Sequence, residues 1–196
     1  MIDDNLSANF FEAKYKDSAD PWDFARSTYE QNRYDEMIKS LGGRHFHRAF
    51  EPGCSIGVLT ERLGAICDQV YATDISATAV TRASVRCSGL PGVFIEEGSL
   101  TDSLPSAAFD LIVLSEVGYY LTEEKLAVLA RNLTDRLTPR GVILAAHWLG
   151  ISSDHVLTGD QVHDILSASL GLERIHSSRH EGFRIDLWSS AIWSNA

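Results

Sequence analysis

From about residue 48 the sequence alternates short apolar runs with amphipathic segments, and this alternation constrains the fold more than any other feature. The run FDLIVLSEV, at 109–117, has the continuous apolar centre expected of a strand buried on both faces. Further strands are expected at 48–51, 69–74, 93–98 and 141–148, and LERIHSS and FRIDLWSSAIW are expected to form a terminal antiparallel pair. Helices are expected between them at 58–67, 76–90, 122–139 and 158–171. This pattern predicts a doubly wound α/β sheet whose ligand lies beyond the carboxyl ends of the strands.

The length of 196 residues suits one domain with a substantial core. We expect a single domain over 1–196 that has three parts. Residues 1–47 form a helical flank or lid, in which STYEQNRYDEMIKSLGG is the clearest helix. Residues 48–148 form a cofactor-binding core, and 149–196 supply a C-terminal helix and the antiparallel strands.

The charge balance limits the partners that this chain is expected to have. Its 17 basic and 27 acidic residues give a net charge of −10, which disfavours nucleic acid and anionic membranes and suits a neutral or cationic substrate. No apolar run is long enough to span a membrane, the N-terminal segment is acidic, and the three cysteines lack C-x-x-C spacing. These features predict a cytoplasmic protein. His147, His155 and His163 recur every eight residues, which is not a ligand spacing, so no metal is expected.

The loop EPGCSIGVLT, which begins at Glu51, predicts the cofactor. A nicotinamide or flavin fingerprint, G-x-G-x-x-G, would need glycine where Ser55 and Val58 stand, and a P-loop would need a Gly-Lys pair that is missing here. The loop instead resembles the S-adenosylmethionine loop of class I methyltransferases, [DE]-x-G-x-G-x-G. Glu51, Gly53 and Gly57 match it, and Ser55 replaces the middle glycine.

Later motifs agree with that resemblance. Asp74 ends the expected second strand about 20 residues beyond the loop, where a carboxylate can accept hydrogen bonds from both ribose hydroxyls. LPSAAFDLIVLSEVGYYL and LTPRGVIL resemble the next motifs of these methyltransferases, and Gly141 is expected at a positive φ. Ser99 stands where related sequences often have an acid. The residues expected to bind S-adenosylmethionine are Trp22, Tyr29, Arg33, Glu51, Gly53, Cys54, Ser55, Gly57, Asp74, Ile75, Ser99, Leu100 and Ser115.

Two of these assignments carry alternatives. Arg33 either pairs with the methionyl carboxylate of the cofactor or lies on a solvated helix face. Either Trp22 or Tyr29 covers the cofactor, and we favour Tyr29.

A closer resemblance narrows the family. DPWDFARSTYEQNRY, FEPGCSIGVLTERL, LSEVGYYL, AAHW and LTGDQVHDIL together resemble the NodS-type methyltransferases, from about residue 19 to the C-terminus. The family's rhizobial members N-methylate the free amine at the non-reducing end of a deacetylated chitooligosaccharide. The resemblance implies the class I methyltransferase fold, a Rossmann-like doubly wound seven-stranded sheet with a reversed last strand, and S-adenosyl-L-homocysteine as product. A methyltransferase for another sugar or small-molecule amine or hydroxyl, and a non-catalytic S-adenosylmethionine-binding protein, stay open, as does the oligomeric state.

The acceptor is expected at the ends of the fourth and fifth strands. Residues expected to contact it are Glu116, Tyr119, Tyr120, His147, Trp148 and His155. Carboxylates, histidines and stacked aromatic rings are the groups that commonly hold an aminosugar. An ammonium has no lone pair, so it must lose a proton before it can attack a methyl group. His147 is our first choice of base and Glu116 the second, although Glu116 could instead orient the substrate or cofactor. His155 either closes over the substrate or is a surface histidine.

Overall fold

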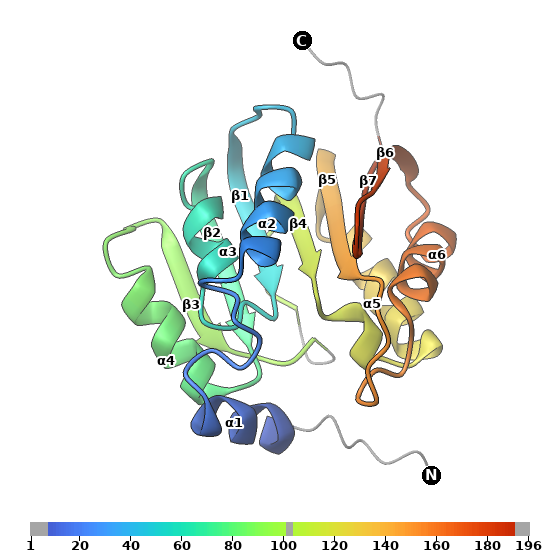
Figure 1. The fold of residues 1–196 in the computed structure, drawn as a ribbon. Coiled ribbons are helices and arrows are strands. Elements are labelled where there is room, and N and C mark those ends of the chain that lie inside the picture. The colour runs from blue at the N-terminus through green and yellow to red at the C-terminus, as the bar shows by residue number, and fades with distance from the viewer. Residues whose placement is uncertain (1–7, 101–103, 191–196) are drawn as a thin grey trace.

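The computed structural model describes residues 8–100 and 104–190. Its centre is a seven-stranded sheet of order β3-β2-β1-β4-β5-β7-β6 (Figure 1). The strands are β1 Phe46–Pro52, β2 Cys67–Asp74, β3 Val93–Glu97, β4 Phe109–Ser115, β5 Leu137–Trp148, β6 Glu173–Arg179 and β7 Phe183–Ser189. β1 to β5 are parallel, whereas β7 lies between β5 and β6 and runs antiparallel to both. This confirms the predicted doubly wound sheet with a reversed last strand.

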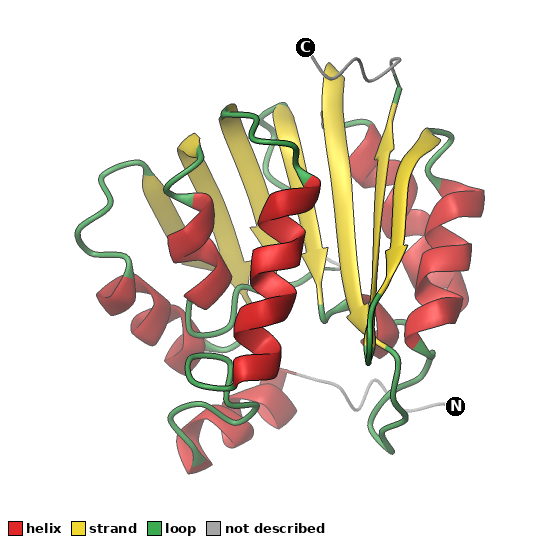
Figure 2. Cartoon of the chain, turned by 45° about the horizontal axis from the view of Figure 1, so that its top comes forward, coloured by secondary structure: helices red, strands yellow, loops and turns green. Residues whose placement is uncertain are grey.

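Helices cover both faces of the sheet (Figure 2). They are α1 Ala8–Asp17, α2 Thr28–Ser40, α3 Val58–Leu63, α4 Ala77–Arg86, α5 Glu123–Thr134 and α6 Gly159–Ser169, with a short 3₁₀ turn, η1, at Gly118–Tyr120. α2 and α3 contribute to one apolar core, and α5 and α6 contribute to the other. α1 lies below the carboxyl ends of the strands (Figure 1).

The apolar run of β4 shows how the sequence builds the two cores. Residues 111–114 are fully buried. Leu111 and Val113 pack into the core beneath α2 and α3, while Ile112 and Leu114 pack into the core beneath α5 and α6. Because successive side chains of a strand point to opposite faces, a strand covered on both faces needs this continuous run.

Several predicted helices end earlier than expected, and the largest difference lies between α5 and β5. The helix expected at 122–139 ends at Thr134, and β5 begins at Leu137, which pairs with Phe109 of β4. Gly141 therefore lies within a strand and does not have a positive φ. A Cβ there would lie 2.7 Å from the Leu137 side chain, so glycine is needed for space.

Two further observations bear on the predictions. The last residues of the expected terminal strand, 191–193, lie outside the described residues. Within residues 8–100 and 104–190, no helix is long and apolar enough to cross a membrane.

Candidate functional site

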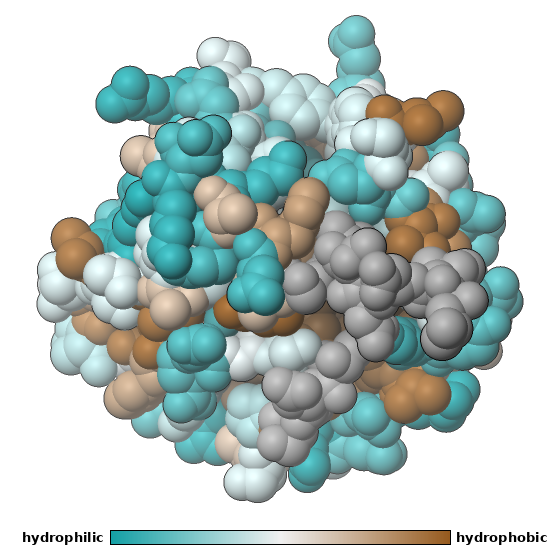
Figure 3. All heavy atoms as spheres, turned by 90° about the horizontal axis from the view of Figure 1, so that it is seen from below, coloured by the Kyte–Doolittle hydropathy of each residue, from teal (hydrophilic) through white to brown (hydrophobic). Residues whose placement is uncertain are grey.

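A cavity of about 570 Å³ lies at the carboxyl ends of the parallel strands, within the roughly 300–1,000 Å³ typical of small-molecule sites. Most of the predicted site residues line it: Trp22, Arg33, Glu51, Gly53, Cys54, Ser55, Asp74, Ile75, Ser99, Leu100, Ser115, Glu116, Tyr119 and Tyr120. Figure 3 views this edge of the molecule from below, and apolar residues show near its middle between hydrophilic ones. The sheet therefore brings the residues predicted to bind the cofactor and those predicted to contact the acceptor to one cavity.

The loop after β1 has an unusual backbone. Gly53, Ser55 and Gly57 all adopt positive φ, at 76°, 53° and 79°. The amides of Gly53 and Cys54 both donate to the Thr73 carbonyl at the end of β2, at 2.7 and 2.9 Å. The loop is thereby tied to the neighbouring strand, and its first residues face the cavity.

Asp74 links this loop to the start of α4. Its two carboxylate oxygens accept hydrogen bonds from the backbone amides of Ser55, at 2.8 Å, and Ser76, at 2.9 Å. Burial raises the pKa of Asp74, against the lowering effect of these backbone bonds. The Ile75 amide adds a third backbone bond to this carboxylate. Because a carboxylate can accept about four hydrogen bonds, Asp74 keeps room for a ligand donor.

Glu51 is a second buried carboxyl group on the cavity wall. The Thr60 hydroxyl donates to its Oε2 at 2.6 Å. Burial raises the pKa of Glu51 to about 8, with a smaller contribution from the nearby Asp74 charge. In the absence of a cationic ligand this side chain is therefore largely protonated at neutral pH.

Arg33 is fully buried, so it does not lie on a solvated helix face. Its Nη1 lies 2.8 Å from Glu116 Oε1 and donates to Ser115 Oγ at 3.1 Å. Its Nε donates to Glu30 Oε2 at 3.1 Å, and its Nη2 also contacts this oxygen. One guanidinium thus stands between two carboxylates beside the cavity.

Glu116 connects β4, β5 and the turn η1. It adopts a positive φ of 59° directly after β4. Its Oε1 accepts from the Trp148 amide at 2.8 Å as well as from Arg33. Its Oε2 accepts from the Tyr119 hydroxyl at 2.6 Å. The carboxylate is held at the cavity wall by three donors, one from each of three elements.

The prediction that His147 faces the crevice is wrong. Its side chain is fully buried and does not line the cavity. Its Nε2 accepts from the Gly118 amide at 3.1 Å, and its Nδ1 lies 3.2 Å from His163 Nε2. Burial lowers the pKa of His147 well below its usual value, and His163 adds to this effect. The ring has no free lone pair toward the cavity, so it cannot take a proton there.

Four other predicted residues also lie off the cavity wall. His155 stacks on the outer side of Tyr119, with ring centroids 3.7 Å apart, and Trp148 packs edge-on against His155. The Tyr29 hydroxyl donates to the Gly182 carbonyl at 2.9 Å, so Trp22 lines the cavity instead. Gly57 faces α4, where a Cβ would lie 3.0 Å from Ala83.

Two residues of α1, Phe11 and Tyr15, line the cavity, although the prediction of a helical flank or lid did not specify them. The Tyr15 hydroxyl donates to Ser55 Oγ at 2.6 Å, and the Phe11 ring packs edge-on against Tyr120 with centroids 5.0 Å apart. The i, i+4 spacing of Phe11 and Tyr15 was the available signal. Across the described parts of the chain, no cluster of three or more His, Cys, Asp or Glu residues has the geometry of a metal site.

Sequence comparisons point to one family. The family model of Nodulation protein S (NodS) matches residues 8–178. Nodulation protein S of Bradyrhizobium diazoefficiens is 31% identical over 122 residues, which cover 61% of this chain and 58% of that protein. The Azorhizobium caulinodans protein is 31% identical over 127 residues, covering 64% of this chain and 61% of that protein. The match thus spans less than two thirds of the length of these relatives.

Structure comparisons agree on the fold. N-methyltransferase NodS from Bradyrhizobium japonicum WM9, in complex with S-adenosyl-L-homocysteine, gives a TM-score of 0.81 at 21% identity, covering 93% of this chain and 97% of that one. A candidate methyltransferase from Pseudomonas syringae gives a TM-score of 0.75 at 32% identity, covering 83% of this chain and 99% of that one. Both likenesses agree with the Rossmann-like methyltransferase fold.

Proposed function

The chain belongs to the NodS family, and from this premise we propose that it is an S-adenosylmethionine-dependent N-methyltransferase. Its proposed acceptor is the free amine at the non-reducing end of a deacetylated chitooligosaccharide. The observation that carries the proposal is one cavity that joins Ser55 and Asp74 to Glu116 and Tyr119. Methyl transfer requires the donor and the acceptor to meet in line in such a shared space.

The residues at the loop end of the cavity fit the cofactor. S-adenosylmethionine supplies a methyl group that its positively charged sulfur already activates, and it also carries an ammonium. The carboxyl groups of Glu51 and Asp74 at this end of the cavity suit such a cation. Asp74 would also accept from the ribose hydroxyls, and Trp22 with Leu100 would contact the apolar parts.

The residues at the other end fit an aminosugar. Glu116 supplies a carboxylate for the amine, and Tyr119 supplies a hydroxyl. The aromatic rings of Phe11 and Tyr120 line the same part of the wall and offer faces for an apolar sugar ring. The volume of the cavity suits one terminal sugar beside the cofactor, so the rest of an oligosaccharide would extend outside it.

With His147 excluded, Glu116 is the group that would receive the amine. The bound cofactor would supply its methyl group to the neutral nitrogen, and the electron pair of the broken carbon–sulfur bond would stay with sulfur. The proton that leaves the nitrogen would pass to Glu116 or to water. Arg33 fixes the position of the Glu116 carboxylate, because it pairs with Oε1 and leaves Oε2 to Tyr119.

An acceptor panel with labelled S-adenosylmethionine tests this function. We expect label on chitooligosaccharides with a free terminal amine and none on their fully acetylated counterparts. Glu116→Gln should lower transfer strongly with little change in cofactor affinity. Glu123→Gln, which removes an exposed carboxylate from the first turn of α5, should behave like the wild type. Equal labelling of acetylated and deacetylated chains would refute the amine as acceptor. Cofactor binding without transfer to any acceptor would favour a non-catalytic binding protein.

A further inference from the structure

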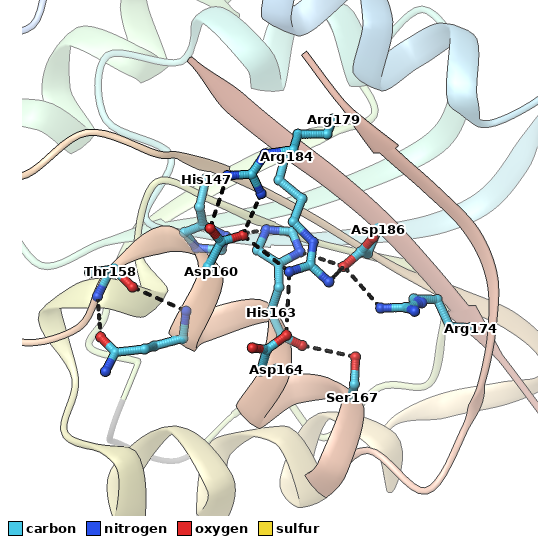
Figure 4. Close-up of polar contacts among 11 residues, drawn as sticks. His147, Thr158, Asp160, His163, Asp164, Ser167, Arg174, Arg179, Arg184 and Asp186 are labelled. Carbon is cyan, nitrogen blue, oxygen red and sulfur yellow. Dashed lines mark hydrogen bonds and ion pairs between the residues drawn. The ribbon is translucent and has the colours of Figure 1, made fainter. Parts of the chain in front are cut away.

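A chain of buried hydrogen bonds runs from β7 to the turn η1 without using any residue of the cavity wall. Asp186 Oδ2 lies 2.8 Å from His163 Nδ1, and His163 Nε2 lies 3.2 Å from His147 Nδ1. His147 Nε2 then accepts from the backbone amide of Gly118 at 3.1 Å. All three side chains are fully buried, and Figure 4 shows them aligned between α6 and the sheet.

The direction in which hydrogen bonds are donated along this series follows from its last bond, at Gly118. A backbone amide can only donate, so His147 Nε2 must be the acceptor and its proton must sit on Nδ1. That proton is donated to His163 Nε2, so the proton of His163 must sit on its own Nδ1. His163 then donates to Asp186, which can accept as a carboxylate. Both rings are therefore neutral and in the same tautomer, and a second proton on either ring would place two donors face to face.

The surrounding charges hold the chain in that state. Burial opposes ionisation of Asp186, but its hydrogen bond with His163 lowers its pKa to about 2, with a smaller contribution from Arg184 of β7, which lies 2.9 Å from the same oxygen. This end of the chain therefore stays a carboxylate. Asp160 and Asp164 of α6 contact Arg184 from the other side. Burial lowers the pKa of both histidines, and the proximity of His163 and of the Arg33 guanidinium lowers the pKa of His147 further.

The hydrogen-bond chain ends at the turn that carries Tyr119 and Tyr120 of the cavity wall. Gly118 begins η1, whose next residue, Tyr119, donates to Glu116. A Cβ on Gly118 would lie 2.5 Å from Val162 Cγ1 and 3.0 Å from His147 Nε2, so the turn is pressed directly onto the ring. A shift of the Gly118 amide would therefore move Tyr119 and Tyr120 at the cavity.

Packing alone does not explain three buried polar side chains here. The neighbouring residues Val162, Leu166 and Trp188 are apolar and fully buried. Apolar side chains of similar size would fill this space without the cost of removing histidine and carboxylate groups from water. What the polar chain adds is a directional bond to one backbone amide.

We propose that Asp186, His163 and His147 are positioning residues, which fix the Gly118 amide through the tautomer of His147 and thereby hold Tyr119 and Glu116 in place for the acceptor. The proposal deepens the proposed function, on which its kinetic part rests. It assigns these residues no contact with the substrate and no share in proton transfer.

Two substitutions at position 147 separate positioning from mere packing. His147→Gln can place an amide oxygen near the position of Nε2 and keep the bond from Gly118. His147→Asn can reach only the position of Nδ1, so it keeps a donor toward His163 and loses the hydrogen bond from the Gly118 amide. For His147→Asn we expect kcat/KM for the acceptor to fall about 100-fold, the scale of a small misplacement of reacting groups. Affinity for S-adenosyl-L-homocysteine should stay unchanged. His147→Gln should restore most of the loss.

Asp186→Leu tests the far end of the chain. Leucine is of similar size but offers no acceptor to His163 Nδ1, so it removes the bond that fixes the tautomers of both histidines. We expect a loss in kcat/KM for the acceptor in the same direction as in His147→Asn. The matched control is Asp164→Leu, which removes another carboxylate that pairs with Arg184 but lies outside the chain. This control should match the wild type.

Nitrogen NMR of ¹⁵N-histidine-labelled protein tests the arrangement without any acceptor. Near neutral pH we expect His147 and His163 both to carry their proton on Nδ1. The Gly118 amide should exchange slowly in wild type and His147→Gln but rapidly in His147→Asn. A charged ring on His147 or His163, or a proton on Nε2 of either, would overturn the proposal. So would an equal loss of activity in the two His147 variants that follows their loss of stability. If the wild type methylates no acceptor, the proposed function fails while the NMR result still decides this inference.

Discussion

Ser55 and Glu116 both hold a left-handed backbone that residues other than glycine seldom adopt. Such residues cost about 1–3 kcal/mol and persist where several contacts hold them. Asp74 and Tyr15 bind Ser55 from two sides, and Arg33 with other donors binds Glu116. Asp23, between α1 and α2, shares this conformation away from the cavity, but Ser55 and Glu116 both line it, where cofactor and acceptor are proposed to meet.

Asp74→Ala should weaken binding of S-adenosyl-L-homocysteine at least about 10-fold, because each hydrogen bond to a charged group contributes roughly 1.5–3 kcal/mol. The variant removes the proposed ribose partner and also frees the amides of Ser55 and Ser76. Titration calorimetry measures the change. Asp68→Ala, at the opposite and exposed end of β2, is the control. Unchanged affinity in Asp74→Ala would refute the ribose assignment.

Glu51 should make the stability of the ligand-free protein depend on pH. Its pKa is about 8 in the folded protein and near 4.5 in the unfolded chain, so only the folded state holds the proton between these values. The stability contribution is therefore full below about pH 4.5 and is lost as pH rises to 8, at up to about 1.4 kcal/mol per pH unit. Urea denaturation of wild type and Glu51→Gln measures it. The wild type should lose stability relative to the variant across this range, and a constant difference would contradict the assignment.

Individual side chains were predictable where one strand end decides their position. Asp74 and Glu116 follow directly from the ends of β2 and β4, and both line the cavity. His147 ends its strand in the same way, but η1 and α6 close over it. Sequence spacing gives the strand that carries a residue and does not reveal which later element will cover it.

At the scale of elements, α1 closes the cavity through polar bonds as well as aromatic rings. Glu12 accepts from the hydroxyls of Ser76 and Thr78 and from the Thr78 amide at the start of α4. These bonds lower the pKa of Glu12 to about 2, so the contact persists wherever the protein is folded near neutral pH. The helix that carries Phe11 and Tyr15 is thus fixed to the same turn that Asp74 holds.

Gly57 has a packing role at the start of α3. Gly57→Ala should lower the free energy of unfolding by about 1–3 kcal/mol, because the φ of +79° strains an L residue and the new Cβ meets Ala83 at 3.0 Å. Gly43→Ala is the matched control, with a φ of +74° and open space around its Cβ. Denaturant unfolding of both separates strain from collision. Equal losses would mean that contact with α4 contributes nothing.

Helices and strands were predictable where their periodicity is strong. Predicted boundaries were wrong where two elements meet without a clear signal in the sequence. The apolar run of β4 and the paired strands β6 and β7 were found from pattern alone. The end of α5 was not, because Asp135, Arg136 and Thr138 fit a helix surface and the first clear stop signal is Pro139. Pairing of Leu137 with Phe109 decides that boundary, and such a long-range contact is not visible in local sequence.

At the scale of the whole molecule, a net charge of −10 accompanies a cavity with acidic groups at both ends. A negative molecule attracts a cationic oligosaccharide over distances set by ionic strength. In the proposed function, Glu116 would distinguish an amine at the end of the oligosaccharide from an acetylated nitrogen, which carries no positive charge. Net charge would then favour encounter, while the proposed acceptor residues would set the position of methylation.

Mass spectrometry of the product formed from S-adenosylmethionine and a deacetylated chitooligosaccharide tests the central claim most directly. Fragmentation should place the added methyl on the nitrogen of the non-reducing terminal sugar, and the fully acetylated oligosaccharide should remain unmodified. A methyl group on an oxygen, on an internal sugar, or on the acetylated chain would contradict the account.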